Sequence, residues 1–203
     1  QGGGSLLLIG PRAAALFEEE LCVCLEGEAD PEARRWLGHG GWLAGLRSPA
    51  QRATLLEGAR PFGRLYAEDD DRGPWEPAAS IAACGQGQLA AIYVDLGERY
   101  LHARTSVVRD FLGALARELY RPLVEVRGSH AVDVTVNRRG EELIVNLVNT
   151  AGPHADENTY VWDEIPPLGP LEVVIRPERR PERVVAEPGG QELAYAWQDG
   201  EVR

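Results

Sequence analysis

Apolar positions near the start of the chain form a short continuous run and then a helical stripe. Residues 6 to 9 are all apolar and are followed by a turn sequence, a pattern typical of a strand buried on both faces in a parallel sheet. Residues 13 to 21 are rich in helix formers and place apolar side chains at helical spacing, which predicts a helix. A strand followed by a helix is half of a βαβ unit, so we expect an α/β region here.

Two further patterned segments belong to this region. Residues 79 to 84 and 88 to 96 are apolar runs separated by a glycine turn, which predicts a hairpin or a turn feeding a buried strand. Residues 105 to 120 carry an apolar stripe at intervals of three and four and end before Pro122, which predicts a helix. Residues 25 to 77 show no sustained period and contain many glycines and prolines, so we interpret them as insertions and short elements.

The period of the apolar pattern changes from about 3.6 to 2 after Pro122, as expected where a helix gives way to strands. Short strands separated by glycine turns are typical of an antiparallel sandwich. We therefore expect an α/β domain over residues 1 to 120 and a β-sandwich over residues 121 to 203. The predicted strands cover residues 124 to 126, 131 to 137, 142 to 149, 171 to 176, 183 to 186 and 192 to 197.

The net charge of the chain makes some classes of binding partner unfavourable. The 203 residues include 32 acidic and 21 basic side chains, for a net charge of -11, which disfavours nucleic acids and anionic membranes. No apolar run approaches the length of about 20 residues that spans a bilayer. A targeting segment is absent from the sequence as given, so the cellular address stays open, with a slight preference for the cytoplasm.

Both ends of the sequence suggest a piece of a longer protein. The chain contains no methionine, and its first glycines resemble the loop that follows a helix. At the other end, the turn at Asp199 and Gly200 is followed by only three residues. We expect a sheet with an unpaired edge at each cut, which predicts marginal stability or association.

Cysteines, histidines and acidic residues show no pattern that predicts a cofactor or metal site. Cys22, Cys24 and Cys84 are too few and too unevenly spaced for a disulfide framework or a zinc site, and we expect them to be small buried hydrophobes. A nucleophilic role for Cys24 or Cys84 is the alternative. The acidic run at residues 68 to 71 lacks the alternating ligands of a calcium loop and is interpreted as a solvated turn.

Three segments resemble the C-terminal half of multidomain glycoside hydrolases similar to β-galactosidases with a trimerisation domain. They are GGGSLLLIG at residues 2 to 10, GQGQLAAIY at residues 85 to 93 and LIVNLVN at residues 143 to 149. In that family a catalytic TIM barrel precedes a glutamine-amidotransferase-like α/β domain and a small β-sandwich. The resemblance implies a truncated amidotransferase-like, flavodoxin-like domain followed by a sandwich. It also implies a non-catalytic structural role, an upstream catalytic domain as partner, and a homo-oligomer as a further possibility.

One loop of the expected sandwich carries candidate carbohydrate contacts. Trp162 can stack on a sugar face, while Asp163 and Glu164 accept hydrogen bonds from sugar hydroxyls, and His154 lies nearby in sequence. The alternative is that this proline-rich loop connects two strands and packs Trp162 on the core.

Three residues within residues 25 to 77 are candidates for a domain interface. Trp36, Trp42 and Arg35 belong to the residue types enriched at protein interfaces. Local packing of the loops is the alternative interpretation.

Overall fold

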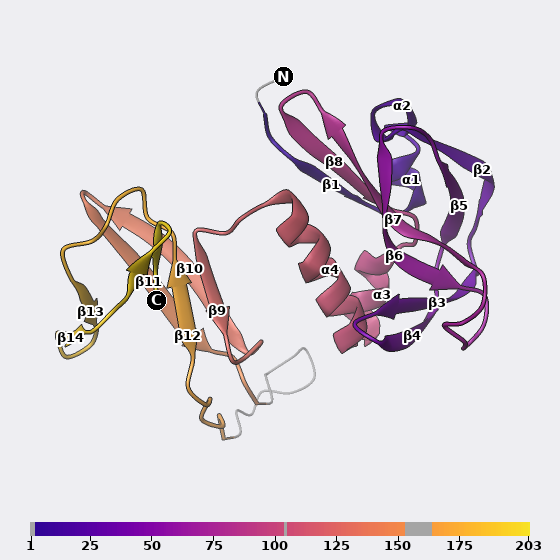
Figure 1. Ribbon diagram of the computed structural model, residues 1–203. Coiled ribbons are helices and arrows are strands. Elements are labelled where there is room, and N and C mark those ends of the chain that lie inside the picture. Colours follow the sequence, from indigo (N-terminus) through magenta and orange to yellow (C-terminus); the bar gives the residue numbers. More distant parts are fainter. Residues whose placement is uncertain (1–2, 104, 153–163) are drawn as a thin grey trace. The chain divides into compact units, whose positions relative to one another are not determined.

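The computed structural model describes residues 3–103, 105–152 and 164–203, which form two compact units (Figure 1). Unit 1 is Gln1–Arg121 and unit 2 is Pro122–Arg203, and each is described by itself. Strands account for 47% of the residues and helices for 15%. The protein is therefore richer in β-structure than the expected α/β region implied.

Unit 1 is built on a curled six-stranded sheet in the order β1-β8-β7-β6-β3-β4 (Figure 1). Strand β1 runs parallel to β8, and every other neighbouring pair in this sheet is antiparallel. The strands are β1 (Leu6–Ile9), β3 (Arg34–His39), β4 (Trp42–Arg47), β6 (Ala59–Tyr66), β7 (Trp75–Cys84) and β8 (Gly87–Ile92).

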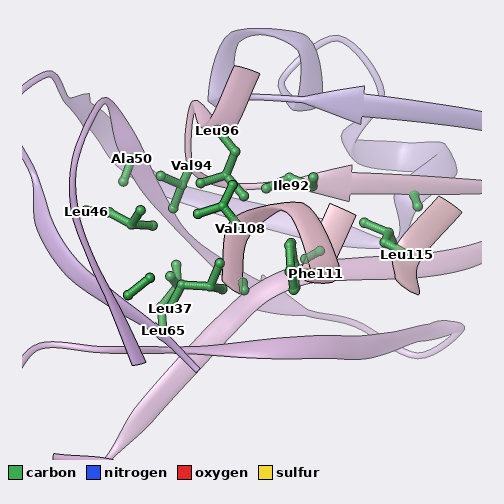
Figure 2. Close-up of a cluster of buried hydrophobic side chains, with 14 of the residues drawn as sticks. Leu37, Leu46, Ala50, Leu65, Ile92, Val94, Leu96, Val108, Phe111 and Leu115 are labelled. Carbon is green, nitrogen blue, oxygen red and sulfur yellow. The ribbon is translucent and has the colours of Figure 1, made fainter. Parts of the chain in front are cut away.

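The sheet is covered on both faces. On one face, α4 (Ser106–Leu119) buries Val108, Phe111 and Leu115 against the strands, and Figure 2 shows these side chains gathered with their neighbours. The other face holds a second apolar cluster, to which a separate two-stranded sheet contributes. The remaining elements of unit 1 are α1 (Pro11–Ala14), α2 (Glu18–Leu21), α3 (Leu96–Ala103) and the two-stranded sheet of β2 (Val23–Asp30) and β5 (Ala50–Leu55).

Strand β8 contains a continuous apolar run whose side chains contribute to the apolar clusters on both faces of the sheet. Ala90 and Ile92 belong to the cluster under α4, whereas Leu89 and Ala91 belong to the opposite cluster. Alternation along a strand sends successive side chains to opposite faces, so a strand between two layers needs apolar residues throughout. The predicted hairpin is thereby confirmed as β7 and β8.

The two glycine motifs of the N-terminal half lie side by side. A Cβ added at Gly87 would stand 1.9 Å from the carbonyl oxygen of Gly4, so only glycine permits this approach of β8 to the chain entering β1. Strand β1 was predicted correctly, but its burial on both faces was wrong. Leu6 and Ile9 are 43% and 39% exposed because β1 is an edge strand with β8 as its sheet neighbour.

The helix predictions had mixed outcomes. The helix over residues 105 to 120 is confirmed as α4. The helix over residues 13 to 21 is wrong, because the backbone leaves helical geometry at Phe17 and leaves two single turns, α1 and α2. The Phe17 side chain packs against the second apolar cluster, so tertiary burial overrides local propensity there. Helix α3 occupies a segment whose first residue was assigned to a strand.

The interpretation of residues 25 to 77 as irregular is also wrong, since this stretch forms β2 to β6 and the start of β7. Glycines within these strands interrupt the alternation of apolar and polar residues by which strands are recognised. Gly45 lies under the Trp36 ring and Gly38 under the Tyr66 ring, where an added Cβ would stand 3.3 Å and 2.8 Å from ring carbons. These glycines are strand residues covered by aromatic rings of the neighbouring strand.

The described residues of unit 2 form strands, as predicted, and these strands are arranged in three small sheets (Figure 1). They are β10 (Val132–Arg139) with β11 (Glu142–Asn149), β13 (Val184–Ala186) with β14 (Gln191–Leu193), and a sheet in the order β15-β16-β12-β9. The last sheet contains β9 (Val124–Arg127), β12 (Glu172–Ile175), β15 (Trp197–Gln198) and β16 (Glu201–Val202). The final strand β16 pairs with β12 and β15, so the unpaired edge expected at this end is not on β16.

Among the helices that the structure describes, none combines the length and the apolar character needed to span a bilayer.

Candidate functional site

A cavity of about 480 Å³ opens beside the turn that joins β3 to β4 in unit 1. Its walls combine aromatic rings with groups that donate and accept hydrogen bonds. The side chains that matter for its chemistry are His39, Trp42, Arg64, Tyr66, Asp71 and Trp75.

The β3–β4 turn presents Trp42 at its end. His39 and Trp42 are paired across the strands, and Gly40 and Gly41 join them with φ angles of 60° and 80°. Two consecutive residues with positive φ are typical of the tight hairpin turns that match strand twist, and glycine adopts them without strain. The Trp42 side chain is left 73% exposed.

The opposite wall of the cavity is fixed by the register of β6 and β7. Tyr66 pairs with Trp75, and Arg64 lies two residues before Tyr66 on β6. The Arg64 guanidinium stands 4.9 Å from the centre of the Trp75 ring, a cation–π contact. Arg64 is exposed, so its N–H groups remain accessible as hydrogen-bond donors beside this contact.

His39 connects the cavity to the core of the unit. Its ring meets that of Phe111 edge to face, with the centroids 5.8 Å apart. A second cavity of about 440 Å³ is lined by His39, Gly40 and Trp42 from the turn and by Ser106, Val107 and Asp110 from α4. Trp42 therefore borders two cavities.

The structure does not bring the three predicted interface residues together. Trp36 and Arg35 are neighbours on β3, so their side chains leave opposite faces of the strand. Arg35 forms an ion pair with Glu76 at 3.8 Å, and the Trp36 ring lies over Gly45. Trp42 is at the far end of the hairpin and is the most exposed of the three.

The predicted carbohydrate-contact residues lie mostly outside the described residues, which include neither His154 nor Trp162 nor Asp163. Glu164 is described and is exposed.

The cysteines are free thiols in three different settings. Cys22 and Cys84 are half-buried, but Cys24 is exposed on β2, so the prediction that it is a buried hydrophobe is wrong. Its side chain leaves the face of the strand opposite to the buried Val23. Within residues 3–103, 105–152 and 164–203, no group of three or more His, Cys, Asp or Glu residues could hold a metal ion.

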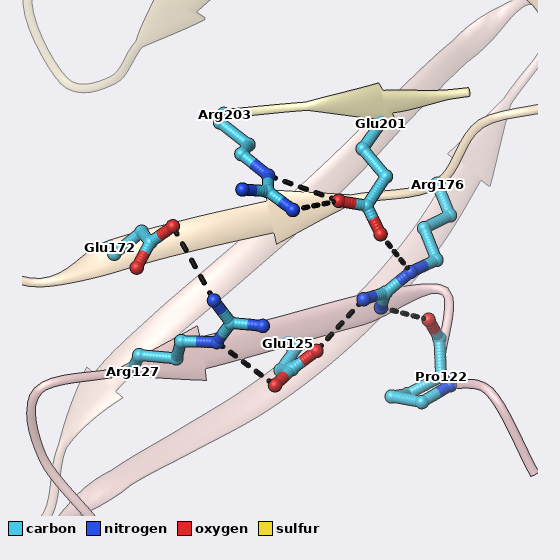
Figure 3. A network of polar contacts seen from close by, with 7 residues as sticks. All are labelled: Pro122, Glu125, Arg127, Glu172, Arg176, Glu201 and Arg203. Atoms are coloured by element: carbon cyan, nitrogen blue, oxygen red, sulfur yellow. Dashed lines mark hydrogen bonds and ion pairs between the residues drawn. The ribbon is translucent and has the colours of Figure 1, made fainter. Parts of the chain in front are cut away.

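Unit 2 contains a network of charged groups (Figure 3). Arg176, which directly follows β12, donates to Glu125 at 2.8 Å, to Glu201 at 2.9 Å and to the carbonyl oxygen of Pro122 at 2.8 Å. Its side chain is 14% exposed, and that of Glu201 is 7% exposed. These contacts tie β9, β12 and β16 together.

The surroundings of the network favour its charged forms. The hydrogen bond from Arg176, followed by the one from Arg127, holds the pKa of Glu125 below its ordinary value. The same bond raises the pKa of Arg176. Sequence reasoning missed this network because its members are far apart in the chain and belong to residue types that are usually solvated.

No protein-family model matches the chain, and no curated protein matches it.

Solved structures do match. The chain is similar to α-L-fucosidase isoenzyme 2 from Paenibacillus thiaminolyticus, with a TM-score of 0.72 and 14% identity over 98% of this chain and 38% of that one. It is also similar to a GH42 β-galactosidase from G. stearothermophilus, with a TM-score of 0.55 and 20% identity over 94% of this chain and 26% of that one. At these identities the likeness is one of fold. The chain spans between about a quarter and two fifths of the length of these structures.

Proposed function

We propose that this chain is a non-catalytic structural region of a glycoside-hydrolase-like protein, in which it supports a catalytic TIM barrel. In this proposal unit 1 is an amidotransferase-like α/β domain and unit 2 is a β-sandwich. The observation that carries the proposal is an asymmetry of coverage. The match to the fucosidase covers 98% of this chain but only 38% of the fucosidase chain, which supports the proposal that this chain is one part of a larger protein.

The chemistry of the cavities supports binding over hydrolysis. Glycosidases use two carboxylates about 5 to 10 Å apart on opposite sides of the scissile bond. Asp71 is the single carboxylate among the residues that line the first cavity, and Asp110 is the single one lining the second. Asp110 is already paired with Arg109 at 3.1 Å. A supporting role requires no catalytic pair in this region.

The interface role of Arg35 and Trp36 remains part of the proposal. Arg35 presents a guanidinium that is partly exposed beside Glu76, and Trp36 offers a half-buried ring on the other face of β3. A neighbouring domain or a second copy of the chain is the expected partner. Trp42 is not part of this proposed interface, because it borders two cavities of a size suited to a smaller ligand.

The test of this proposal is an assay of the purified chain on a panel of aryl glycosides that includes fucosides and galactosides. We expect no turnover above the rate of a blank. Turnover that is lost in both Asp71→Asn and Asp110→Asn would overturn the non-catalytic assignment. In the longer parent protein, deleting this region should lower the melting temperature or change the oligomeric state, and a parent unchanged in both would count against a supporting role.

A further inference from the structure

We propose that the cavity beside the β3–β4 turn is a binding site for a neutral oligosaccharide, with Trp42 as the stacking surface and Arg64 and Asp71 as hydrogen-bonding groups. This site rests on the geometry of unit 1 and does not depend on the proposed structural role.

The space available fits a ligand of this kind. Small-molecule sites usually enclose about 300 to 1,000 Å³. The two cavities measure about 480 Å³ and 440 Å³ and share His39, Gly40 and Trp42 as lining residues. Trp42 therefore contacts a ligand bound in either cavity.

Trp42 and Trp75 supply the apolar part of the recognition. A sugar ring has a face of C–H groups that packs on an aromatic ring and an edge of hydroxyl groups that needs polar partners. Trp42 is 73% exposed and Trp75 is 43% exposed, which is unusual for the largest apolar side chain. The exposed Trp42 ring is available for such stacking without any rearrangement of the core, whereas Arg64 already covers one face of the Trp75 ring.

The polar groups of the site include both hydrogen-bond donors and acceptors, and both a positive and a negative side chain. Arg64, which lies over the Trp75 ring, can donate hydrogen bonds, and Asp71 can accept them. Ser106 and Asp110 add a hydroxyl and a carboxylate at the second cavity. A phosphorylated ligand would call for a cluster of cations, and the single Arg lining the first cavity is accompanied by an Asp. The mixture fits a neutral ligand with many hydroxyls.

A protein partner fits this surface less well. The central part of a protein interface is depleted of Asp, Glu and Lys, although Trp, Tyr and Arg are enriched there. Here Asp71 lies among the aromatic rings that line the cavity, and glycines form the adjacent turn. Groups of this kind, within a hollow of limited volume, favour a small polyhydroxylated ligand.

Titration of the 203-residue chain with neutral tetrasaccharides tests the site. The probes are cellotetraose, xylotetraose, mannotetraose and β-1,4-galactotetraose, followed by tryptophan fluorescence and calorimetry at millimolar concentrations. We expect saturable binding of at least one probe. In Trp42→Ala the affinity for that probe should fall about tenfold or more, and Asp71→Asn should weaken it while leaving the fold intact.

Tyr120→Ala provides the matched control, because Tyr120 is also an exposed aromatic residue of unit 1, at 66%, and lies outside both cavities. Its affinity for the probe should equal that of the unaltered chain. The proposal is overturned by the absence of saturable binding to every probe. It is equally overturned by binding that Trp42→Ala and Trp75→Ala leave unchanged, or by a Trp42→Ala effect seen only on self-association. Each of these outcomes leaves the aryl glycoside assay unaffected, so the two proposals fail separately.

Discussion

The two units of this chain are stabilised in different ways. Unit 1 encloses its sheet between two apolar clusters that include Phe111, Ile92 and Tyr93 at 0% exposure. In the described part of unit 2, Val174 and Val202 are the only buried hydrophobic residues. Its strands are instead joined by the ion pairs around Arg176.

This difference separates two sources of stability. Burial of apolar surface depends little on pH or salt but is sensitive to lost volume. A network of partly buried charges depends on the protonation of its carboxylates and on keeping every partner. Unit 1 is therefore expected to respond to changes of side-chain volume and unit 2 to changes of charge.

Phe111→Ala should have the largest effect. The ring is fully buried and contacts the rings of His39 and Phe62, so its removal should lower the free energy of unfolding of unit 1 by about 3 to 5 kcal/mol. Hydrogen exchange of the β8 amides under native conditions measures this unit directly. Tyr120→Ala, on the exposed end of α4, should change it by less than about 0.5 kcal/mol. Equal effects of the two substitutions would contradict an apolar core centred on Phe111.

Arg176→Met should have the next largest effect. The substitution keeps the length of the side chain but leaves Glu125 and Glu201 without their shared partner, so unit 2 should lose about 2 to 3 kcal/mol. Arg138→Met is the matched control, since Arg138 forms one exposed pair with Glu178 and should cost less than about 0.5 kcal/mol. Exchange of the β12 amides measures both. Similar losses of stability in the two variants would mean that the network stabilises unit 2 no more than a single exposed ion pair does.

The pH dependence of unit 2 should follow the lowered pKa of Glu125. Because this pKa lies below the ordinary 4.5, the contribution of Glu125 is fully present above pH 4.5 and is lost as the pH falls through the folded-state value. Acid titration of β9 amide exchange should show this loss, and Glu125→Gln should flatten it. In unit 1 the lowered pKa of Asp70 belongs to an exposed turn, so its effect should be small. A steeper loss of stability at acid pH in unit 1 than in unit 2 would contradict the expectation that unit 2 is the more sensitive to charge.

Gly113→Ala should have the smallest effect and the opposite sign. Gly113 lies in the middle of α4, where an added Cβ would meet nothing closer than Arg117 at 3.5 Å. Alanine should stabilise unit 1 by about 0.5 to 1 kcal/mol. Gly63→Ala is the contrast, because Gly63 has a φ of 66° and an added Cβ would stand 2.3 Å from the Phe111 ring. It should destabilise the unit, and thermal melts of both variants distinguish the two signs.

Periodic segments could be predicted from the sequence, and segments shaped by tertiary contacts could not. The stripe of α4 and the alternation of β10 and β11 were sufficient for correct assignments. Strands β3 and β4 were missed because Gly38 and Gly45 interrupt the apolar pattern where rings from other strands cover them. Phe17 broke a predicted helix because its side chain packs into a cluster formed by distant residues.

The cavity was only partly foreseeable. Trp42 was identified as a candidate for a domain interface and not for a cavity, and its partners Arg64, Asp71 and Trp75 come from strands and turns whose pairing the sequence pattern did not reveal. The tight turn at Gly40 and Gly41 was the available signal, since consecutive glycines between a His and a Trp are typical of a hairpin. A hairpin assignment there would have placed Trp42 opposite His39 on the neighbouring strand.

The most direct test of the account is a nuclear magnetic resonance titration of the tryptophan indole N–H signals with cellotetraose and β-1,4-galactotetraose. Signals are assigned by replacing each tryptophan with phenylalanine. A saccharide site beside the β3–β4 turn predicts saturable shifts of the Trp42 and Trp75 signals in unit 1 and an unchanged Trp197 signal in unit 2. Shifts confined to Trp162 or Trp197, or no shift at all, would contradict the placement of a saccharide site in unit 1.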